Sequence, residues 1–175
     1  MENPSLTILE TGRLVLRKLT SNDAAFILDL LNQLSFIRYV GDKGVRTLED
    51  ARHFIESGPV QSYQRYGFGL YLVEEKQSAT PMGICGLLKR ETLEDFDLGF
   101  AFLPTYWSQG YATEAGQAVL NAAKANHGLH RVVAITNVDN HASMSVLGRL
   151  GFAFEGMMQM AEEKPEIRLF GKALV

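Results

Sequence analysis

Asp97-Leu-Gly-Phe-Ala-Phe-Leu-Pro-Thr-Tyr-Trp-Ser-Gln-Gly-Tyr-Ala-Thr-Glu114 is the stretch that decides the predicted fold of this chain. Leu98, Phe100 and Phe102 alternate with smaller or polar residues, which is the period-two pattern of a half-buried strand. Pro104 has no amide hydrogen to donate to a neighbouring strand, so the strand ends there. A tight turn follows, and small apolar residues then recur at helical spacing. The stretch therefore predicts a strand, a loop and a helix in succession.

The start of this helix is expected to bind an anion. The N–H groups of a first helical turn have no partner inside the helix and carry the positive end of its dipole, and Gly110 allows a ligand to approach closely. We therefore expect a phosphate group there, with an ordinary strand-to-helix connection as the alternative. The Walker pattern and the Gly-x-Gly-x-x-Gly dinucleotide pattern are both missing from this stretch, which argues against an NTPase or a Rossmann protein.

The composition predicts one globular domain over residues 1–175, with 46% apolar and 21% charged residues. A net charge of −3 with scattered Lys and Arg argues against a nucleic-acid partner. No apolar run approaches membrane length and the first residues do not resemble a signal peptide, so we expect a cytoplasmic protein without a membrane partner. The four histidines lack metal-ligand spacing, so no metal is expected. Cys85 lies in an apolar run and is expected to be buried and inert.

The remaining patterns give the order of elements. A helix is expected around Phe26 to Leu34, a loop over 35–46, and a second helix from the Thr47 capping box to Gly58-Pro59. A last helix over 142–150 is closed by Gly151. Strands are expected over 13–19, 68–73, 82–88, 97–103, 131–136, 152–157 and 167–174. A right-handed crossover would place strand 131–136 parallel to strand 97–103. The order β-α-α-β-β-β-α-β-α-β-β predicts an α/β (mixed α+β) fold whose mixed central sheet has six to seven strands, with helices on both faces.

Three motifs resemble one known family. Trp107-Ser-Gln-Gly110-Tyr-Ala112 resembles the pyrophosphate loop, Gln/Arg-x-x-Gly-x-Gly/Ala, of the GNAT superfamily of acetyl-CoA-dependent N-acetyltransferases. Trp107 departs from that pattern, but a Trp at this place is familiar in the ribosomal-protein (Rim-type) branch. The run from Asn140 through Ser143 to Gly151-Phe152 is similar to that branch's Asn-x-x-Ser helix, and Leu9-Glu-Thr-Gly-Arg13-Leu-Val-Leu-Arg17 is similar to its opening. The element order is likewise similar to the GNAT fold.

The resemblance implies where acetyl-CoA and the acceptor bind. In the family, the pantetheine arm enters a gap between the strands that correspond to 97–103 and 131–136, while the pyrophosphate rests on the loop. The implied acetyl-CoA contacts are Phe102, Leu103, Gln109, Gly110, Tyr111, Ala112, Thr113, Asn140 and Ser143. Asn140 could instead, or in addition, cap the helix that follows it. The segment after the first strand arches over the acceptor in the family, so Phe36, Arg38 and Tyr39 are candidate acceptor contacts, with a solvated loop as the alternative.

Transfer of an acetyl group to an amine needs a base, an oxyanion site and an acid. Asp97, or Glu94 before it, could remove the amine proton directly or through water, although a charge at a strand entrance is usually solvated. Backbone N–H groups near Phe102 and Leu103 could stabilise the oxyanion. Many GNAT enzymes carry a tyrosine where Leu147 stands, and Leu147 cannot donate a proton. The resemblance gives that role to Ser143, one helical turn earlier; capping of local backbone is its alternative.

The resemblance implies an N-acetyltransferase in which the amine attacks acetyl-CoA directly in a ternary complex, and the acceptor it implies is a protein N-terminal α-amine. One alternative is a small amine such as a polyamine, an amino acid or an antibiotic, since the acidic side chains of Glu155, Glu162, Glu163 and Glu166 could attract a cation. A second alternative is a non-catalytic acyl-CoA-binding domain that has lost the tyrosine. We expect a monomer or a homodimer.

Overall fold

The computed structural model describes residues 6–175, which form an eight-stranded sheet in the order β1-β2-β3-β4-β5-β6-β8-β7. The strands are β1 (Thr7–Glu10), β2 (Leu14–Lys18), β3 (Leu70–Glu75), β4 (Pro81–Leu88), β5 (Asp97–Phe102), β6 (Arg131–Thr136), β7 (Ala153–Gln159) and β8 (Glu166–Ala173). The sheet exceeds the predicted six to seven strands because β1 was missed. That short edge strand is largely exposed, so it lacks the alternation of buried residues from which a strand is predicted.

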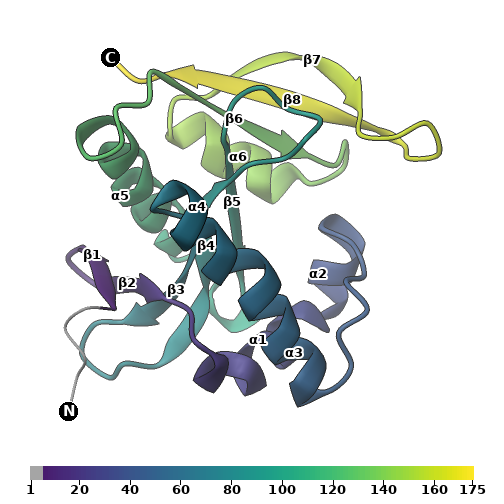
Figure 1. Ribbon diagram of the computed structural model, residues 1–175. Helices are drawn as coiled ribbons and strands as arrows, with labels where there is room; N and C mark the ends of the chain where they lie inside the picture. The colour runs from purple at the N-terminus through teal and green to yellow at the C-terminus, as the bar shows by residue number, and fades with distance from the viewer. Residues whose placement is uncertain (1–5) are drawn as a thin grey trace.

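The sheet consists of two antiparallel halves that meet at one parallel pair. Each of β1 to β4 pairs antiparallel with the next strand, and β8 inserts antiparallel between β6 and β7. Between the halves, β5 and β6 run parallel, as the sequence predicted. Figure 1 shows the β7–β8 hairpin extending across the top of the molecule beside α6 (His141–Arg149).

Helices cover both faces of the sheet, as predicted. The others are α1 (Ala24–Leu31), α2 (Leu34–Tyr39), α3 (Leu48–Ile55), α4 (Gln61–Tyr66) and α5 (Tyr111–Ala125), with short turns η1 (Ser21–Asp23), η2 (Glu56–Val60) and η3 (Pro104–Tyr106). On one face, α1 and α3 pack with Leu72 and Ile84 of the sheet. On the other face, α5 and α6 pack with Cys85 and Leu98 (Figure 1). Cys85 is buried as predicted, and this burial raises the pKa of its thiol to about 12.

Two predictions for the segment between β2 and β3 were wrong. The loop expected over 35–46 contains α2, whose Phe36 side chain is buried in the core and fixes the helix against α1. The helix expected to end at Gly58-Pro59 instead widens into the π-turn η2 and continues as α4 to Gly67, which ends it in a left-handed conformation. A widened turn tolerates proline because the N–H group that proline lacks is not needed there.

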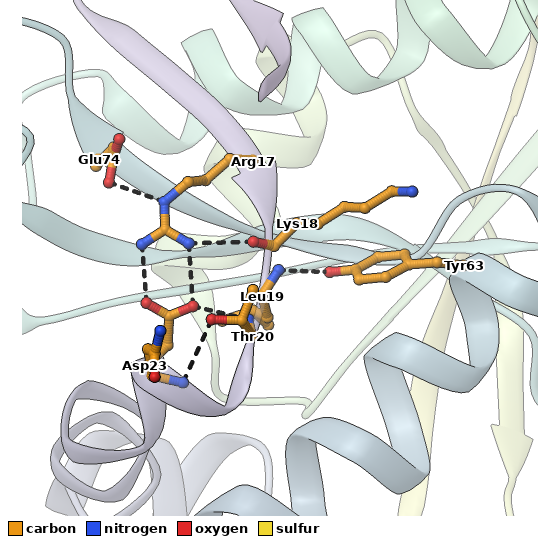
Figure 2. A network of polar contacts seen from close by, with 8 residues as sticks. Arg17, Lys18, Leu19, Thr20, Asp23, Tyr63 and Glu74 are labelled. Atoms are coloured by element: carbon orange, nitrogen blue, oxygen red, sulfur yellow. Dashed lines mark hydrogen bonds and ion pairs between the residues drawn. The ribbon is translucent and has the colours of Figure 1, made fainter. Parts of the chain in front are cut away.

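Hydrogen bonds and ion pairs fix the starts of α3 and α1. Thr47 and Asp50 form the predicted capping box of α3. Figure 2 shows the corner after β2, where Arg17 binds Asp23 through two contacts of 3.0 and 2.8 Å and reaches Glu74 at 3.2 Å. Asp23 also accepts a hydrogen bond from the Thr20 N–H group at 2.9 Å, so one largely buried carboxylate fixes the turn that leads into α1. No helix in residues 6–175 is long and apolar enough to cross a membrane.

Candidate active site

A gap opens in the middle of the sheet, between β5 and β6. The two strands share one pair of residues, Asp97 and Val133, and the Val133 N–H group donates to the Phe96 carbonyl at 3.0 Å. Beyond Asp97, β5 stays paired with β4 along its whole length while β6 stays paired with β8. The two strands therefore diverge, because each follows its own antiparallel neighbour.

Main-chain groups of β5 point into this gap. The Leu103 N–H group donates to the Met82 carbonyl on the β4 side at 3.0 Å. Hydrogen-bonding directions alternate along a strand, so Phe102, Phe100 and Leu98 direct their main-chain groups to the opposite side, toward β6. The Phe102 carbonyl is satisfied by the Trp107 indole N–H at 2.8 Å. Beyond the Asp97–Val133 pair, the edge of β5 at Phe100 has no partner strand, which is costly for buried backbone unless a ligand supplies the hydrogen bonds.

A cavity of about 780 Å³ opens along this edge. Its walls come from β5, β6, α2, the start of α6, the α3–α4 region and the loops β4–β5 and β7–β8. The lining follows β5 as far as Ala101 and includes Asn140, Ser143 and Leu147 of the α6 region. Phe102 and Leu103 lie beyond the lining, and Leu103 has its N–H group committed to Met82. This leaves the Phe102 N–H group as the donor directed toward the gap at that end of β5.

Asp97 lies at the closed end of the gap and is 1% exposed. Burial raises the pKa of this carboxyl, while Arg90, whose Nε lies 3.2 Å from each carboxylate oxygen, opposes the shift. The sequence allowed for a solvated charge here, whereas Asp97 is buried and lines the cavity. Glu94 is exposed and does not line it.

The start of α6 brings two polar side chains, Asn140 and Ser143, to the cavity. The Asn140 side-chain oxygen accepts a hydrogen bond from the Ser143 N–H group at 3.2 Å, so Asn140 caps the helix. This confirms capping, one of the two roles predicted for Asn140. Ser143 lines the cavity one turn before the buried Leu147. Nearby on β6, the Thr136 hydroxyl is buried and makes no hydrogen bond within the described chain. An unpaired buried hydroxyl at a cavity wall is a group that a ligand can satisfy.

The turn between β5 and α5 lies just past the end of the gap. Ser108 and Gly110 are both left-handed, with φ of 60° and 84°, and they turn the chain sharply into α5. Gly110, at the N-cap of this helix, has no side chain to cap it, and the first internal bond runs from the Glu114 N–H group to the Gly110 carbonyl at 3.0 Å. The N–H groups of Tyr111, Ala112 and Thr113 therefore precede the first intrahelical bond and stay available. Gln109 directs its side-chain amide back to the Thr105 carbonyl at 2.9 Å.

Arg13, which sequence reasoning did not select, reaches this turn from the start of β2. Its Nε contacts a Glu114 oxygen at 3.1 Å, its guanidinium lies 4.2 Å from the centre of the Tyr111 ring, and it is half exposed. A Cβ built on Gly110 would lie 3.4 Å from an Arg13 nitrogen. The positive charge beside the turn therefore offsets Glu114, which would otherwise repel an anion.

The three predicted acceptor contacts lie on α2 and all line the cavity. Phe36 belongs largely to the core, at 7% exposure. Arg38 is paired with Asp139 at 3.0 Å, and its carbonyl accepts from the Asn137 side chain at 3.2 Å. These contacts tie α2 to the loop between β6 and α6, so α2 forms a fixed wall of the cavity. Residues 6–175 hold no group of three or more His, Cys, Asp or Glu side chains suited to a metal ion.

The profile of the Acetyltransferase (GNAT) domain family matches residues 13–153. The chain belongs to this family. The uncharacterized N-acetyltransferase YoaA of Bacillus subtilis is 28% identical over 154 residues, which cover 87% of this chain and 86% of YoaA. As a GNAT acetyltransferase, the chain uses acetyl-CoA as its co-substrate, as predicted.

Solved structures share the GNAT fold at low sequence identity. RimL, a ribosomal L7/L12 α-N-protein acetyltransferase in complex with coenzyme A, has a TM-score of 0.84 and 20% identity, covering 96% of this chain and 98% of RimL. The microcin C7 self-immunity acetyltransferase MccE, in complex with acetyl-CoA and AMP, has a TM-score of 0.81 and 20% identity, covering 98% of this chain and 97% of MccE. At these identities the likeness shows the common fold.

The chemistry of acetyl-CoA fits the groups of this GNAT site. A diphosphate needs clustered N–H donors and a positive field, which the uncapped start of α5 and Arg13 provide. The pantetheine arm carries amides, which need donors and acceptors such as those of the unpaired edge at Phe100. The buried hydroxyls of Thr113 and Thr136 also lack protein partners within the described chain.

Proposed function

We propose that this acetyltransferase moves the acetyl group of acetyl-CoA to the α-amine at the N-terminus of a peptide or protein, by direct attack in a ternary complex. One observation carries the choice of amine. Asp97 is the single carboxylate among the described residues that line the cavity, and it is held by Arg90. The site therefore offers one modest base rather than a strongly acidic pocket, and it favours an amine that loses its proton easily.

The proton equilibrium of the amine supports the same choice. At pH 7.5, about one third of an α-amine with a pKa near 7.8 is neutral, against about 0.1% of a lysine-type amine with a pKa near 10.4. A side chain with the raised pKa of Asp97 accepts a proton more readily than an ordinary aspartate. Asp97, directly or through a water, then completes the deprotonation of an α-amine. The same help would leave a polyamine almost fully charged.

The elements at the gap divide the binding of acetyl-CoA between them. The N–H groups of residues 110–113 hold the diphosphate, with Arg13 beside them, and the edge of β5 at Phe100 pairs with the amide-containing arm. Asn140 uses its side-chain oxygen to cap α6, which leaves its side-chain nitrogen free to donate to that arm. Acetyl-CoA supplies the activated thioester, and the strands fix its direction toward the acceptor side of the sheet.

Two groups of the chain act on the reacting centre in this proposal. The Phe102 N–H group, directed toward the gap, stabilises the oxyanion that develops on the acetyl carbonyl. The Ser143 hydroxyl, on the α6 wall of the cavity, gives a proton to the departing thiolate. The Leu147 side chain, one helical turn after Ser143 on α6, lies in the core and forms an apolar wall of the site.

The experiment is release of free coenzyme A thiol from acetyl-CoA in the presence of a panel of peptides and small amines. We expect thiol release with peptides that carry a free α-amine and none with the same peptides blocked at the N-terminus. Mass spectrometry then places the acetyl group on the α-nitrogen, and intersecting initial-velocity lines identify a ternary complex. Acetylation of small amines alone would replace the acceptor in this proposal. Binding of acetyl-CoA without thiol release for any acceptor would favour a non-catalytic binding domain.

A further inference from the structure

The charges that line the cavity are strongly unbalanced. Among the described residues of its lining, Asp97 is the one carboxylate, whereas the cationic residues are Arg38, Lys43, Arg65, Lys89, Arg90 and Lys164. The four glutamates expected to attract a cationic acceptor, Glu155, Glu162, Glu163 and Glu166, do not line it. Glu155 is instead paired with Arg131. The acceptor side of the site is therefore electropositive.

Several of these cations already have partners. Arg38 is paired with Asp139, and Arg90 shares Asp97. Lys89 donates to the carbonyls of Arg90 and Leu93. The ammonium groups of Lys43 and Lys164, in contrast, form no hydrogen bond or ion pair with any other residue of the described chain, and the hydrogen bonds of Lys164 to Ala161 and Gln159 use its main chain. Two unsatisfied ammonium groups therefore face the same cavity.

Lys43, Arg90 and Lys164 form one cluster, assembled from three separate loops. Lys43 follows α2, Arg90 lies between β4 and β5, and Lys164 lies between β7 and β8. Desolvation, followed by the positive charges of Arg90 and Lys164, lowers the pKa of Lys43. All three side chains line the same cavity. Lys43 is exposed to solvent, so an anionic group can reach it.

We propose that the acceptor carries an anionic group, a carboxylate or a phosphate, which binds to Lys43 and Lys164 with Arg90 beside them while the acceptor amine faces the gap between β5 and β6. This inference rests on the proposed acetyl transfer and specifies its acceptor. A peptide with acidic residues close to its N-terminus and a small amino acid or phosphorylated amine both have this chemistry. A polyamine has the opposite charge and is repelled by the cluster.

The test uses acceptors that share one amine and differ in charge. One arm compares a peptide that has Asp and Glu at its second to fourth positions with the peptide that has Asn and Gln there. The other arm compares O-phosphoethanolamine with ethanolamine, and spermidine serves as the cationic acceptor. Coenzyme A thiol release gives kcat/KM for each. We expect the anionic member to exceed its neutral partner at least tenfold in one arm, and this ratio to fall with added salt because screening weakens the attraction.

Variants connect the preference to the cluster. Lys43→Gln and Lys164→Gln each reduce the anionic-to-neutral ratio of kcat/KM about tenfold, whereas Lys124→Gln, an exposed lysine on α5 outside the cavity, leaves the ratio unchanged. The change lies in KM for the acceptor, since the lysines bind a remote group. The inference would be overturned if kcat/KM were equal for the anionic and neutral acceptors in both arms. It would also be overturned if Lys43→Gln and Lys164→Gln both left the anionic-to-neutral ratio of kcat/KM unchanged. Neither result would contradict acetyl transfer itself.

Direct binding separates this inference from the proposed function. If no acceptor is acetylated, the proposed transfer fails. Calorimetry then measures whether O-phosphoethanolamine and the acidic peptide bind to the full chain in the presence of coenzyme A. Binding that weakens about tenfold in Lys43→Gln but not in Lys124→Gln would still support the anion site. Absence of binding by both probes would overturn it. The acceptor pair that shows the preference, the peptides or the small amines, identifies the source of the anionic group.

Discussion

Replacement of Gly110 by alanine should weaken acetyl-CoA binding far more than it weakens the fold. Gly110 has a φ of 84°, and a Cβ there would meet only an Arg13 nitrogen at 3.4 Å, so the change introduces backbone strain without a severe clash. An L-residue in the left-handed region costs about 1 to 2 kcal/mol. The turn can relieve this strain by rotating its N–H groups, which are the groups assigned to the diphosphate.

The expected magnitudes follow from those numbers. A loss of about 1 kcal/mol lowers the melting temperature of a domain of this size by about 2 to 4 °C. A hydrogen bond to a charged group contributes about 1.5 to 3 kcal/mol, so the loss of one raises the Kd for acetyl-CoA about ten- to a hundredfold. Gly128→Ala is the matched control, since Gly128 is also left-handed, with a φ of 63° and open space around it, in the connection between α5 and β6.

Calorimetry of acetyl-CoA binding and thermal unfolding of both variants measure these effects. We expect similar melting temperatures for Gly110→Ala and Gly128→Ala, and a raised Kd for the first alone. Equal affinities of the two variants would refute the assignment of the diphosphate to this turn. A fall in affinity shared by both would show that general destabilisation, rather than the local N–H groups, controls binding.

Three further changes test other parts of the molecule. Ser143→Ala should lower kcat about a hundredfold with little change in the Kd for acetyl-CoA, because a general acid acts in the transition state; unchanged turnover would remove Ser143 from the mechanism. Because the pKa of Asp97 is raised, kcat/KM should begin to fall on acidification at a higher pH than it would with an ordinary aspartate as the base. Asp97→Asn should abolish this fall in kcat/KM at acidic pH. A fall that persists in the variant would be due to another group. Asp23→Asn should lower the free energy of unfolding by about 2 to 4 kcal/mol in urea titrations, since it leaves Arg17 without its bidentate partner. A loss below about 0.5 kcal/mol would show that this corner does not stabilise the fold.

The sequence predicted the centre of the fold because its signals there are local. Pro104 ends β5 and Gly110 begins α5, and both act within a few residues. The bounds of β6 were predicted correctly because its residues are apolar and β-branched in an uninterrupted run. The short helix α2 was missed, since only one of its six residues, Phe36, is buried, and Leu34 is 85% exposed. A single buried side chain gives no periodicity.

The site was predicted less completely because it is assembled over long sequence distances. Arg13 lies about a hundred residues from Glu114, which it contacts, and no spacing in the sequence indicates this pairing. The cationic cluster joins three loops that lie far apart in the sequence, between α2 and α3, between β4 and β5, and between β7 and β8. The acidic loop between those strands was expected to face the acceptor through its glutamates, yet Lys164 lines the cavity. Net charge along a loop therefore does not indicate which of its residues reach a site.

Amide hydrogen exchange of β5, followed by NMR with and without coenzyme A, tests the central claim most directly. If the pantetheine arm of coenzyme A fills the gap between β5 and β6, the N–H group of Phe100 gains protection on binding, while that of Val133, already bonded to Phe96, changes little. Binding of coenzyme A that leaves the exchange of Phe100 unchanged would contradict the account.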